Sequence, residues 1–540
     1  MLLLLLNATG FVLTLLVFYP GVVTVDAMAV YADVKSGFVG DWQSPVMAKL
    51  WTVIDPMTRR ILDLPRGLEG AVVSMFLLTI SLYWLAFTVL SLAVARDSVA
   101  IAGLVIIIAL SPPLFVMAGA IWRDILLAVA WLLAAALVFA TVNAPRLPSI
   151  MARAAALVLL GFGLLLRPNA LLAAPFVLAY ILWPGAFRLK RVALLYIPAV
   201  LTGFLMVQLI YYGLLDAKRQ HIMHAILVFD LGAITAITKE NQFPVDWTEH
   251  QLRLLRASCY DPAQWDTYWR VPPCQFVMGG KLEPENVFGT PVLIQAWLKA
   301  VTSHPLIYLR HRLGHMEAFL TFPHSAIYLQ SIGKGVPMYP HNAYFMRLYE
   351  ATDAMKESFI FRPLTWVLLA LATLVATWKW RASPPGSYAV AMSASALAYV
   401  ATFLLVGVAS DYRYVYWVVA AGLTSAAMAA LAWTTGRSGV PRRLMSRASL
   451  RDGKEIGTQG PERQPCVADC PLPRSGKELG EPALRHQDQV LFQLPVVPAQ
   501  DSAGSAKRSV PPVQQGNGGV MLDREVPVGN RDEDRSADPT

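Results

Sequence analysis

The sequence predicts an all-α polytopic membrane protein with about ten transmembrane helices, and its composition is the first reason. Of the 540 residues, 56% are hydrophobic and 15% are charged, whereas soluble domains carry about 25% charged residues. The second reason is that the hydrophobic residues gather in long runs. About 20 mostly apolar residues suffice for a helix to cross the hydrocarbon core, and shorter helices are tolerated inside a bundle.

The predicted spans form two groups, separated by a long polar region. In chain order they cover 2–19, 70–94, 100–117, 124–143, 152–166, 170–183, 192–213, 363–378, 387–408 and 412–433. The first run has no basic segment before it and exceeds the ~7 to 15 apolar residues of a signal peptide. We therefore interpret it as a retained helix. A cleaved signal is the alternative, because an A-x-A pattern occurs at Ala27 to Ala29.

The distribution of lysine and arginine predicts the orientation. If the N-terminus is cytoplasmic, the short outer turns hold only Arg123, Arg167 and Arg413. The inner side then holds Arg96, Arg146, Arg153, Arg188, Lys190, Arg191, Lys379, Arg381, Arg437, Arg442 and Arg443. Basic residues are enriched on the cytoplasmic side of membrane proteins, so both termini are predicted to lie inside.

This topology divides the chain into four parts. They are a transmembrane module (1–213) with a first outer loop (20–69), an outer helical region (214–362), C-terminal transmembrane helices (363–434) and an inner tail (435–540). The tail is rich in Pro, Gly, Ser and mixed charge, and we predict that it is disordered. Its Cys466 and Cys470 have no His or further Cys nearby, so we interpret them as reduced thiols.

The outer region contains one run that could be an eleventh span, HIMHAILVFDLGAITAI at 221–237. The run is short and carries Asp230 at its centre, and its insertion would turn the basic loop at 379–381 outward. We therefore predict an interfacial helix on the outer membrane surface. Cys259 and Cys274 also lie in this region, on the oxidising side, and we predict a disulfide between them.

Two more helices are predicted in the outer region, over 292–302 and 304–320. In the second, apolar residues recur at steps of three and four residues, as an amphipathic helix requires; they are Leu306, Leu309, Leu313, Met316 and Leu320. Pro305, with Ser303 as N-cap, supports its start. We expect His311, Arg312 and His315 on its wet face.

Charged residues gather beside the outer ends of the predicted spans. They are Asp26, Asp33, Lys35, Asp41, Lys49, Arg123, Asp124, Arg167, Asp411 and Arg413. A guanidinium binds phosphate through a two-pronged fork, and a carboxylate can accept a proton from an alcohol. The set therefore suits a substrate with phosphate and hydroxyl groups. Nucleic acid is not expected as a partner despite the net charge of +9, because the basic residues are scattered between apolar runs.

Each of these residues also has a structural interpretation. Asp26 could be the N-cap of a short helix that runs to about Ser36, a role that does not exclude catalysis. Arg123 and Asp124 could be a structural pair that opens the fourth span, since an acid suits a helix N-terminus. Asp33 and Lys35 could be solvated helix charges, and Arg167 and Arg413 could be interface anchors that reach toward water.

Several stretches resemble the GT-C glycosyltransferases, especially the protein O-mannosyltransferases and the lipid A aminoarabinose transferase. An acid just after the first span and a later GDW-x-x-P, in VTVDAMAVYADVKSGFVGDWQSP, resemble the first outer loop of that family. WRDILLAVAWLLAAAL resembles the segment that carries its second acid, and LLLRPNALLAAP and ASDYRYVYW resemble segments of bacterial members. VFDLGAIT and HPLIYLRHRL resemble an uncharacterised bacterial branch. The resemblance covers roughly residues 5 to 433.

The resemblance implies a GT-C-like arrangement of helices in a bacterial inner membrane. It implies transfer of a sugar from a polyprenyl-phosphate donor to a glycan, lipid or protein acceptor on the outer face, with inversion at the anomeric carbon. Asp26 matches the family's catalytic acid and would be the general base. Arg413, Arg167 and Arg123 would bind the phosphate, and Asp124 and Asp41 would orient the acceptor, a metal or the base. We add Lys49 and Trp42 as candidate substrate-binding residues.

The sequence departs from the family at two places. Many relatives have an acid directly after the first Asp, where this chain has Ala27, and the protein O-mannosyltransferases have His-Pro-Pro where this chain has Gln43-Ser44-Pro45. The use of a divalent cation therefore stays open. A transporter or flippase of lipid-linked glycans, a glycan polymerase or ligase, and a non-catalytic scaffold are the alternative functions.

Overall fold

The computed structural model describes residues 1–64, 68–269, 272–321, 340 and 342–437. The described residues all belong to one compact unit, Met1–Gly453. The tail that the sequence predicts as disordered, with Cys466 and Cys470, lies outside the described residues except for 435–437.

The described residues confirm the predicted fold class, because they form α-helices, short helical turns and isolated β-bridges. Among the described residues, seven helices are long and apolar enough to cross a membrane: Gly70–Val94, Arg123–Ala140, Arg146–Leu166, Leu189–Leu214, Pro363–Trp380, Pro384–Val406 and Tyr412–Gly436. Three shorter apolar helices cover Leu2–Phe18, Val99–Ala109 and His224–Thr238. The chain is therefore an all-α, multi-pass membrane protein.

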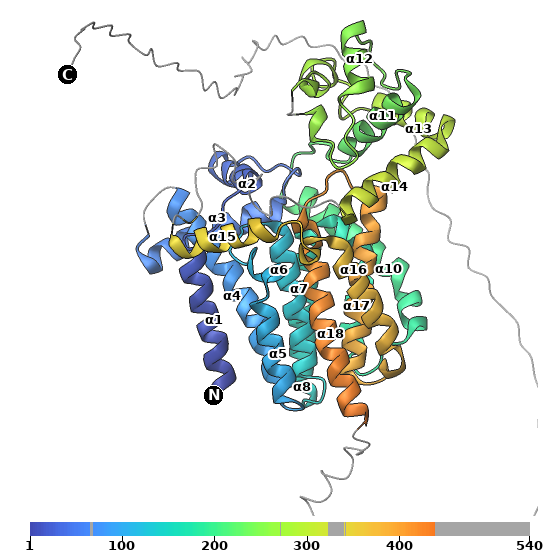
Figure 1. Ribbon diagram of the computed structural model, residues 1–540. Coiled ribbons are helices and arrows are strands. Elements are labelled where there is room, and N and C mark those ends of the chain that lie inside the picture. Colours follow the sequence, from blue (N-terminus) through green and yellow to red (C-terminus); the bar gives the residue numbers. More distant parts are fainter. Residues whose placement is uncertain (65–67, 270–271, 322–339, 341, 438–540) are drawn as a thin grey trace, which may run out of the picture. The chain divides into compact units, whose positions relative to one another are not determined.

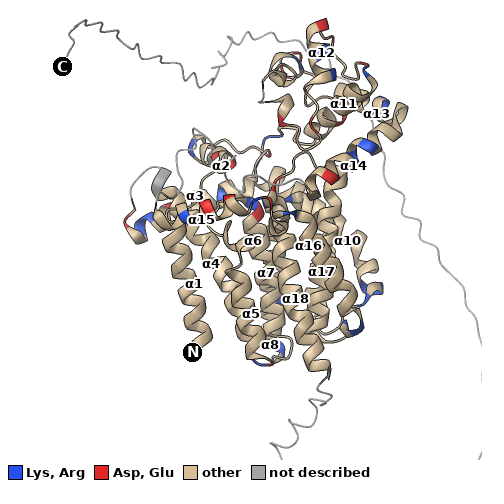
Figure 2. Ribbon diagram, viewed as in Figure 1, with Lys and Arg blue, Asp and Glu red and all other residues tan. Residues whose placement is uncertain are grey.

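The helical bundle contains most of the long apolar helices, which pack side by side (Figure 1). Its members are α1 (Leu2–Phe18), α4 (Leu68–Val94), α5 (Val99–Ala109), α6 (Pro112–Phe115), α7 (Arg123–Ala140), α8 (Arg146–Leu166), α9 (Ala174–Leu182), α10 (Leu189–Gln208), α16 (Pro363–Thr377), α17 (Pro384–Val406) and α18 (Tyr416–Arg437). Charged residues are rare along the bundle and gather near the ends of its helices (Figure 2).

Helix α7 is the centre of the bundle, with α4, α8 and α18 around it. It is apolar on all sides, as a helix enclosed by others should be, and nearly all of its residues are buried. Trp131 donates from Nε1 to the Leu160 carbonyl of α8 at 3.1 Å and meets the Trp417 ring of α18 edge-on, with centroids 5.3 Å apart. One hydrophobic core thus joins helices that precede residue 213 with helices that follow residue 363.

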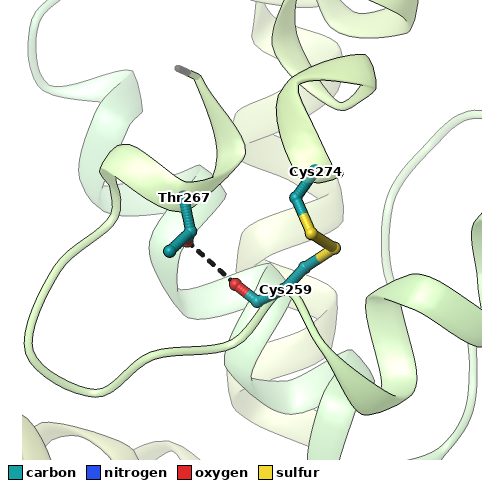
Figure 3. The surroundings of a disulfide bond; sticks show 3 residues. All are labelled: Cys259, Thr267 and Cys274. Atoms are coloured by element: carbon teal, nitrogen blue, oxygen red, sulfur yellow. Dashed lines mark hydrogen bonds between the residues drawn. A yellow bond between two sulfur atoms is a disulfide. The ribbon is translucent and has the colours of Figure 1, made fainter. Parts of the chain in front are cut away.

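Residues 215–362 are here called the middle region, and its buried residues between Ala225 and Ala300 build a second hydrophobic core. The helices of the middle region are α11 (His224–Thr238), α12 (Glu249–Ala257), α13 (Pro291–Ser303), α14 (Pro305–Thr321) and α15 (Ala343–Met355). Phe319 of α14 and Phe345 of α15 belong to the core of the bundle. The disulfide between Cys259 and Cys274 lies in the second core, and Thr267 donates from its hydroxyl to the Cys259 carbonyl at 2.8 Å (Figure 3). The cross-link closes a loop with a sequence separation of 15 residues.

Two expectations for the middle region are wrong. The run at 221–237 is a core helix rather than an interfacial one, because 12 of the 15 residues of α11 are buried, Asp230 included. Helix α14 does not carry His311, Arg312 and His315 on a wet face, because their exposed fractions are 1%, 2% and 0%. Both helices bury polar groups because those groups satisfy one another.

The loop between α1 and α4 carries α2 (Val25–Ser36) and α3 (Pro45–Leu62). Its start is fixed to the segment before α7 by a parallel bridge between Val22 and Ala120. Its middle is fixed to the end of α8, where Ser44 donates from its hydroxyl to the Leu165 carbonyl at 2.9 Å. These contacts bring α2 against the N-terminal end of α7.

Candidate active site

A small pocket, partly open to solvent, lies where α2, the start of α7, the end of α8 and the turn before α18 meet. Its charged lining consists of Asp26, Arg123, Asp124, Arg167 and Arg413. These residues come from four different predicted turns, and the structure brings them together. Gln43, Trp122 and Met47 are among its other lining residues.

Asp26 lies in the first turn of α2, whose N-cap is Thr24 and not Asp26 as one interpretation held. Thr24 accepts from the Ala27 amide and from the Trp122 indole, so α2 starts at a fixed point beside α7. The carboxylate of Asp26 is left to face the pocket. One oxygen accepts from Arg413 Nη1, the other accepts from Gln43 Nε2 at 3.1 Å, and the side chain stays 35% exposed.

Electrostatics keep Asp26 ionised at neutral pH. Burial by itself would raise the pKa of the carboxyl, since it disfavours the charged form. The positive charge of Arg413, supported by Arg123 and Arg167, outweighs burial and lowers the pKa to about 2. Asp26 is therefore a carboxylate that can accept a proton.

Arg413 is held from several sides in the turn Tyr412–Val415 before α18. Asp411 binds it twice, because one oxygen accepts from the Arg413 amide at 3.1 Å and the other pairs with Nε at 2.9 Å. Its guanidinium carbon lies 5.0 Å from the ring centroids of both Trp122 and Tyr414. Contacts of this kind attract a cation to an aromatic face, so the fork is aimed at Asp26.

Asp124 and Arg167 form a second ion pair in the pocket, with Asp124 Oδ1 and Arg167 Nε 2.6 Å apart. Both are well buried, at 4% and 11% side-chain exposure. Asp124 is in the first turn of α7, where an acid interacts favourably with the helix dipole. Arg167 follows α8 directly and lies 4.5 Å from the Tyr414 ring centroid, so one tyrosine contacts both arginines.

Arg123 differs from the other two arginines in its partners. It donates from Nη1 to the Trp42 carbonyl at 3.2 Å. Within the described ranges it forms no ion pair with a carboxylate, whereas Arg167 and Arg413 each do. Arg123 thus has donors available for an anionic ligand.

The structure does not bring three of the predicted residues into the pocket. Asp41 accepts from the Tyr212 hydroxyl and from the Gln220 amide, both at 2.7 Å, and so fixes the first loop to the chain after α10. The Trp42 ring packs on Trp269 of the middle region, with centroids 5.5 Å apart. Lys49 is exposed on α3. The conformation of the loop determines where these three side chains lie, and that conformation cannot be read from the loop sequence.

Three other residues contact the charged residues of the pocket and were not predicted as candidates. Gln43 binds Asp26, Trp122 lies under Arg413, and Tyr414 contacts both Arg167 and Arg413. Trp122 and Tyr414 could have been found as the sequence neighbours of Arg123 and Arg413. Gln43 carried no such signal, because only the folded loop brings it back to α2.

The donor set of the pocket does not fit a divalent cation. Each pocket carboxylate is ion-paired with an arginine, and three arginines line the pocket against two aspartates. Among the described residues, no group of three or more His, Cys, Asp and Glu side chains is arranged to hold a metal ion. The pocket fits an anion, which guanidinium groups bind through charge-assisted hydrogen bonds.

Comparison with known proteins gives little further information. No family model matches the sequence, and no curated protein matches it. Among solved structures, the chain is similar to the archaeal oligosaccharyltransferase AglB from Archaeoglobus fulgidus in complex with an inhibitory peptide and a dolichol-phosphate, at 13% identity and a TM-score of 0.34. The match covers 85% of this chain and 52% of the other, so this chain spans about half the length of that protein.

Proposed function

We propose that the protein is an inverting membrane glycosyltransferase of the GT-C type. It transfers a sugar from a polyprenyl-phosphate donor to a hydroxyl group of a glycan, lipid or protein acceptor. One observation carries this proposal: the ionised carboxylate of Asp26 and three arginines line the same open pocket. The reaction needs both chemistries within reach of one bond, a base for the hydroxyl and cations for the phosphate.

The proposed reaction is a single displacement. The acceptor oxygen forms a bond to the anomeric carbon, and the bond from that carbon to the phosphate oxygen breaks. The electron pair of the broken bond stays on the polyprenyl phosphate, which gains one negative charge, and the acceptor proton moves to Asp26. The leaving group needs no acid, because cations placed beforehand stabilise the charge that develops on it.

Arg413 couples the two halves of this reaction. While it pairs with Asp26, it lowers the pKa of that carboxyl and makes it a weak base. A donor phosphate in the pocket competes for the same guanidinium, and Arg123 adds a second fork. Asp26 then loses part of its counter-charge, its pKa rises, and its basicity increases when the donor is present.

The location of the charges favours transfer over transport. Transporter sites lie near the middle of the membrane, at broken helices. Here the pocket lies at the start of α7 and the end of α8. The distribution of basic residues in the sequence supports cytoplasmic termini and a pocket on the opposite face of the membrane. The family resemblance is what suggests a bacterial inner membrane.

Asp26→Asn tests the proposal, with Asp33→Asn as the matched control on the same helix but outside the pocket. Cells without the gene are complemented with each variant, and their envelope glycans and lipid-linked sugars are compared by mass spectrometry. We expect one sugar to be missing with Asp26→Asn and present with Asp33→Asn, at equal protein levels. Near-normal glycosylation with Asp26→Asn would show the assignment to be wrong.

If lipid-linked sugar instead accumulates on the cytoplasmic face in the deletion strain, the protein is a flippase.

A further inference from the structure

A second cluster of charged residues is buried in the middle region, away from the residues that line the pocket. Asp230 of α11 and His311, Arg312 and His315 of α14 have exposed fractions of 0%, 1%, 2% and 0%. A buried charge is costly unless it is paired and hydrogen-bonded. The proposed reaction uses none of these residues.

The cluster is organised around Asp230, whose two oxygens are both engaged. One oxygen pairs with Arg312 Nη2 at 2.7 Å and with His311 Nε2 at 3.2 Å. The other accepts from Trp297 Nε1 at 2.7 Å. On its far side, the His311 ring bonds the Tyr260 hydroxyl through Nδ1 at 3.0 Å. Asp230 therefore holds one arm of the Arg312 guanidinium in place.

The other arm of Arg312 leaves the cluster and reaches the chain that follows α17. Its Nη1 donates to the Gly407 carbonyl at 2.7 Å. Position 407 leaves no room for a side chain, since a Cβ atom there would lie 2.4 Å from the Phe403 carbonyl oxygen and 2.6 Å from His315 Nε2. Arg312 and His315 thus pack closely against the backbone at Gly407.

The next three residues are held by the middle region as well. The Trp265 amide donates to the Val408 carbonyl at 2.8 Å, and the Ser410 amide donates to the Ala263 carbonyl at 2.8 Å. Gln264 and Ala409 form an antiparallel bridge between these two bonds. Residues 407–410 therefore have their backbone fixed along their whole length by residues of the middle region.

This fixed segment leads directly to the pocket. Asp411 follows it, and Asp411 binds both the amide and the Nε of Arg413. Arg413 in turn pairs with Asp26. A chain of direct contacts thus runs from Asp230 through Arg312 and residues 407–411 to the arginine of the pocket.

We propose that Arg312 and Asp230 are positioning residues for Arg413. They hold residues 407–410 against the middle region and so set where the Arg413 guanidinium lies relative to Asp26. Arginine suits this task because its rigid fork can bond two partners in fixed directions, while lysine offers a point charge on a flexible stem. The role of Arg413 rests on the proposed function, whereas the fastening of residues 407–410 does not.

Amide hydrogen exchange of the purified full chain tests the fastening without any substrate. Arg312→Lys keeps a cation near Asp230 but cannot bond Asp230 and Gly407 together. We expect the Ser410 and Arg413 amides, which the Ala263 carbonyl and the Asp411 carboxylate protect, to exchange at least about tenfold faster, with the melting temperature little changed. Tyr260→Phe is the control, because it removes a bond of the same cluster that does not reach residues 407–410.

If Arg312→Lys fails to fold, Gly407→Ala tests the same contact by changing the partner of Arg312. The added methyl group displaces the segment while Asp230 and Arg312 stay paired. A folded variant of either kind that exchanges the Ser410 and Arg413 amides at the wild-type rate would overturn the proposal.

A double-mutant cycle tests the effect on the pocket. Affinity for polyprenyl phosphate in detergent is measured for Arg312→Lys, Arg413→Lys and the double variant. We expect Arg312→Lys alone to weaken binding several-fold. In a chain that already carries Arg413→Lys, we expect it to weaken binding no further, because Arg312 acts through Arg413. Additive losses would overturn the positioning role. If the wild-type chain binds no polyprenyl phosphate, the proposed function fails, and the exchange experiment still decides whether the segment is fastened.

Discussion

Two clusters in this protein pair aspartate with arginine and differ in how far they are exposed to solvent. In the pocket, Asp26 is 35% exposed and pairs with Arg413 beside a third arginine that has no carboxylate partner among the described residues. In the middle region, Asp230 and Arg312 are 0% and 2% exposed, and each oxygen of Asp230 has a partner. The open, unevenly balanced cluster can exchange its partners for a ligand. The closed cluster has no exposed partner to exchange, so it holds the neighbouring chain in a fixed position.

The largest effect should come from breaking the closed cluster. Asp230→Ala leaves the Arg312 guanidinium buried without its counter-charge, and loss of one partner of a buried pair costs about 3–5 kcal/mol. We expect that loss in the free energy of unfolding, measured by denaturant titration in detergent. Asp26→Ala is the comparison and should change stability by less than about 1 kcal/mol, because its site is open to water. Equal losses would mean that the two clusters do not differ as described.

Removal of the Arg413 fork should affect activity more than stability. Arg413→Gln takes away a cation placed for the developing phosphate charge, and loss of one such donor costs about 10²–10³ in rate. The measurement is sugar transfer from a polyprenyl-phosphate donor by purified protein. Arg413→Lys should recover part of the rate, because it restores the charge without the fork. A Gln variant with wild-type turnover would remove Arg413 from the mechanism.

A smaller effect is expected at Arg123. Arg123→Lys keeps the charge but loses the two-pronged geometry, and we expect about tenfold weaker donor binding with little change in turnover of the bound donor. Arg96→Lys is the matched control, since Arg96 also donates to a backbone carbonyl, that of Ala140. If both variants bind the donor with the same affinity, Arg123 does not bind the donor phosphate.

The smallest effect concerns pH and the closed cluster. Burial lowers the pKa of His315 to about 4, against partial compensation from the Pro262 carbonyl, and burial also lowers the pKa of His311. Each histidine binds more protons when unfolded, so the stability it contributes is complete above the unfolded pKa of about 6.5 and falls as the pH drops below it. For His315 the fall continues to the folded pKa of about 4.

For His315 we expect a loss of roughly 1 kcal/mol between pH 7 and about 5.5, and His311 should add a loss of the same sign. Thermal unfolding at the two pH values measures it. His315→Gln should flatten the pH dependence, whereas His250→Gln on the exposed face of α12 should not. If the stability of the His315 variant depended more steeply on pH than that of the wild type, the direction assigned to the pKa shift of His315 would be wrong.

The sequence predicts the bundle better than the middle region, for a physical reason. Apolar runs such as 70–94 and 387–408 define membrane helices directly, because few other structures tolerate so many apolar residues in succession. In α14, the periodicity was wrong for Leu306, Leu309 and Leu313, which are exposed, whereas Met316 and Leu320 pack against the core of the bundle. Leu306 is 79% exposed while Arg312 is 2% exposed. Arg312 can be buried because Asp230, on a helix distant in sequence, pairs with it.

The same limit explains the predicted site. Asp26, Arg123, Asp124, Arg167 and Arg413 stand next to helix ends, so topology alone gathers them at one end of the bundle. Asp41, Trp42 and Lys49 lie between α1 and α4. In such a segment, a shift of one or two residues along the sequence determines whether a side chain reaches the pocket or makes a structural contact elsewhere. Asp41 bonds Tyr212, which is 171 residues away in sequence, and no local pattern encodes such a partner.

The disulfide has a consequence for how a working protein is made. Cys259 and Cys274 enclose the loop whose residues 263–265 hold the backbone of residues 408–410. Thiol oxidation during biogenesis therefore completes the support on which Arg413 depends. Chains produced in cells that cannot form the cross-link would carry every residue of the pocket and still have that arginine loosely placed, so preparations for enzymology should be checked for free thiols before activity is compared.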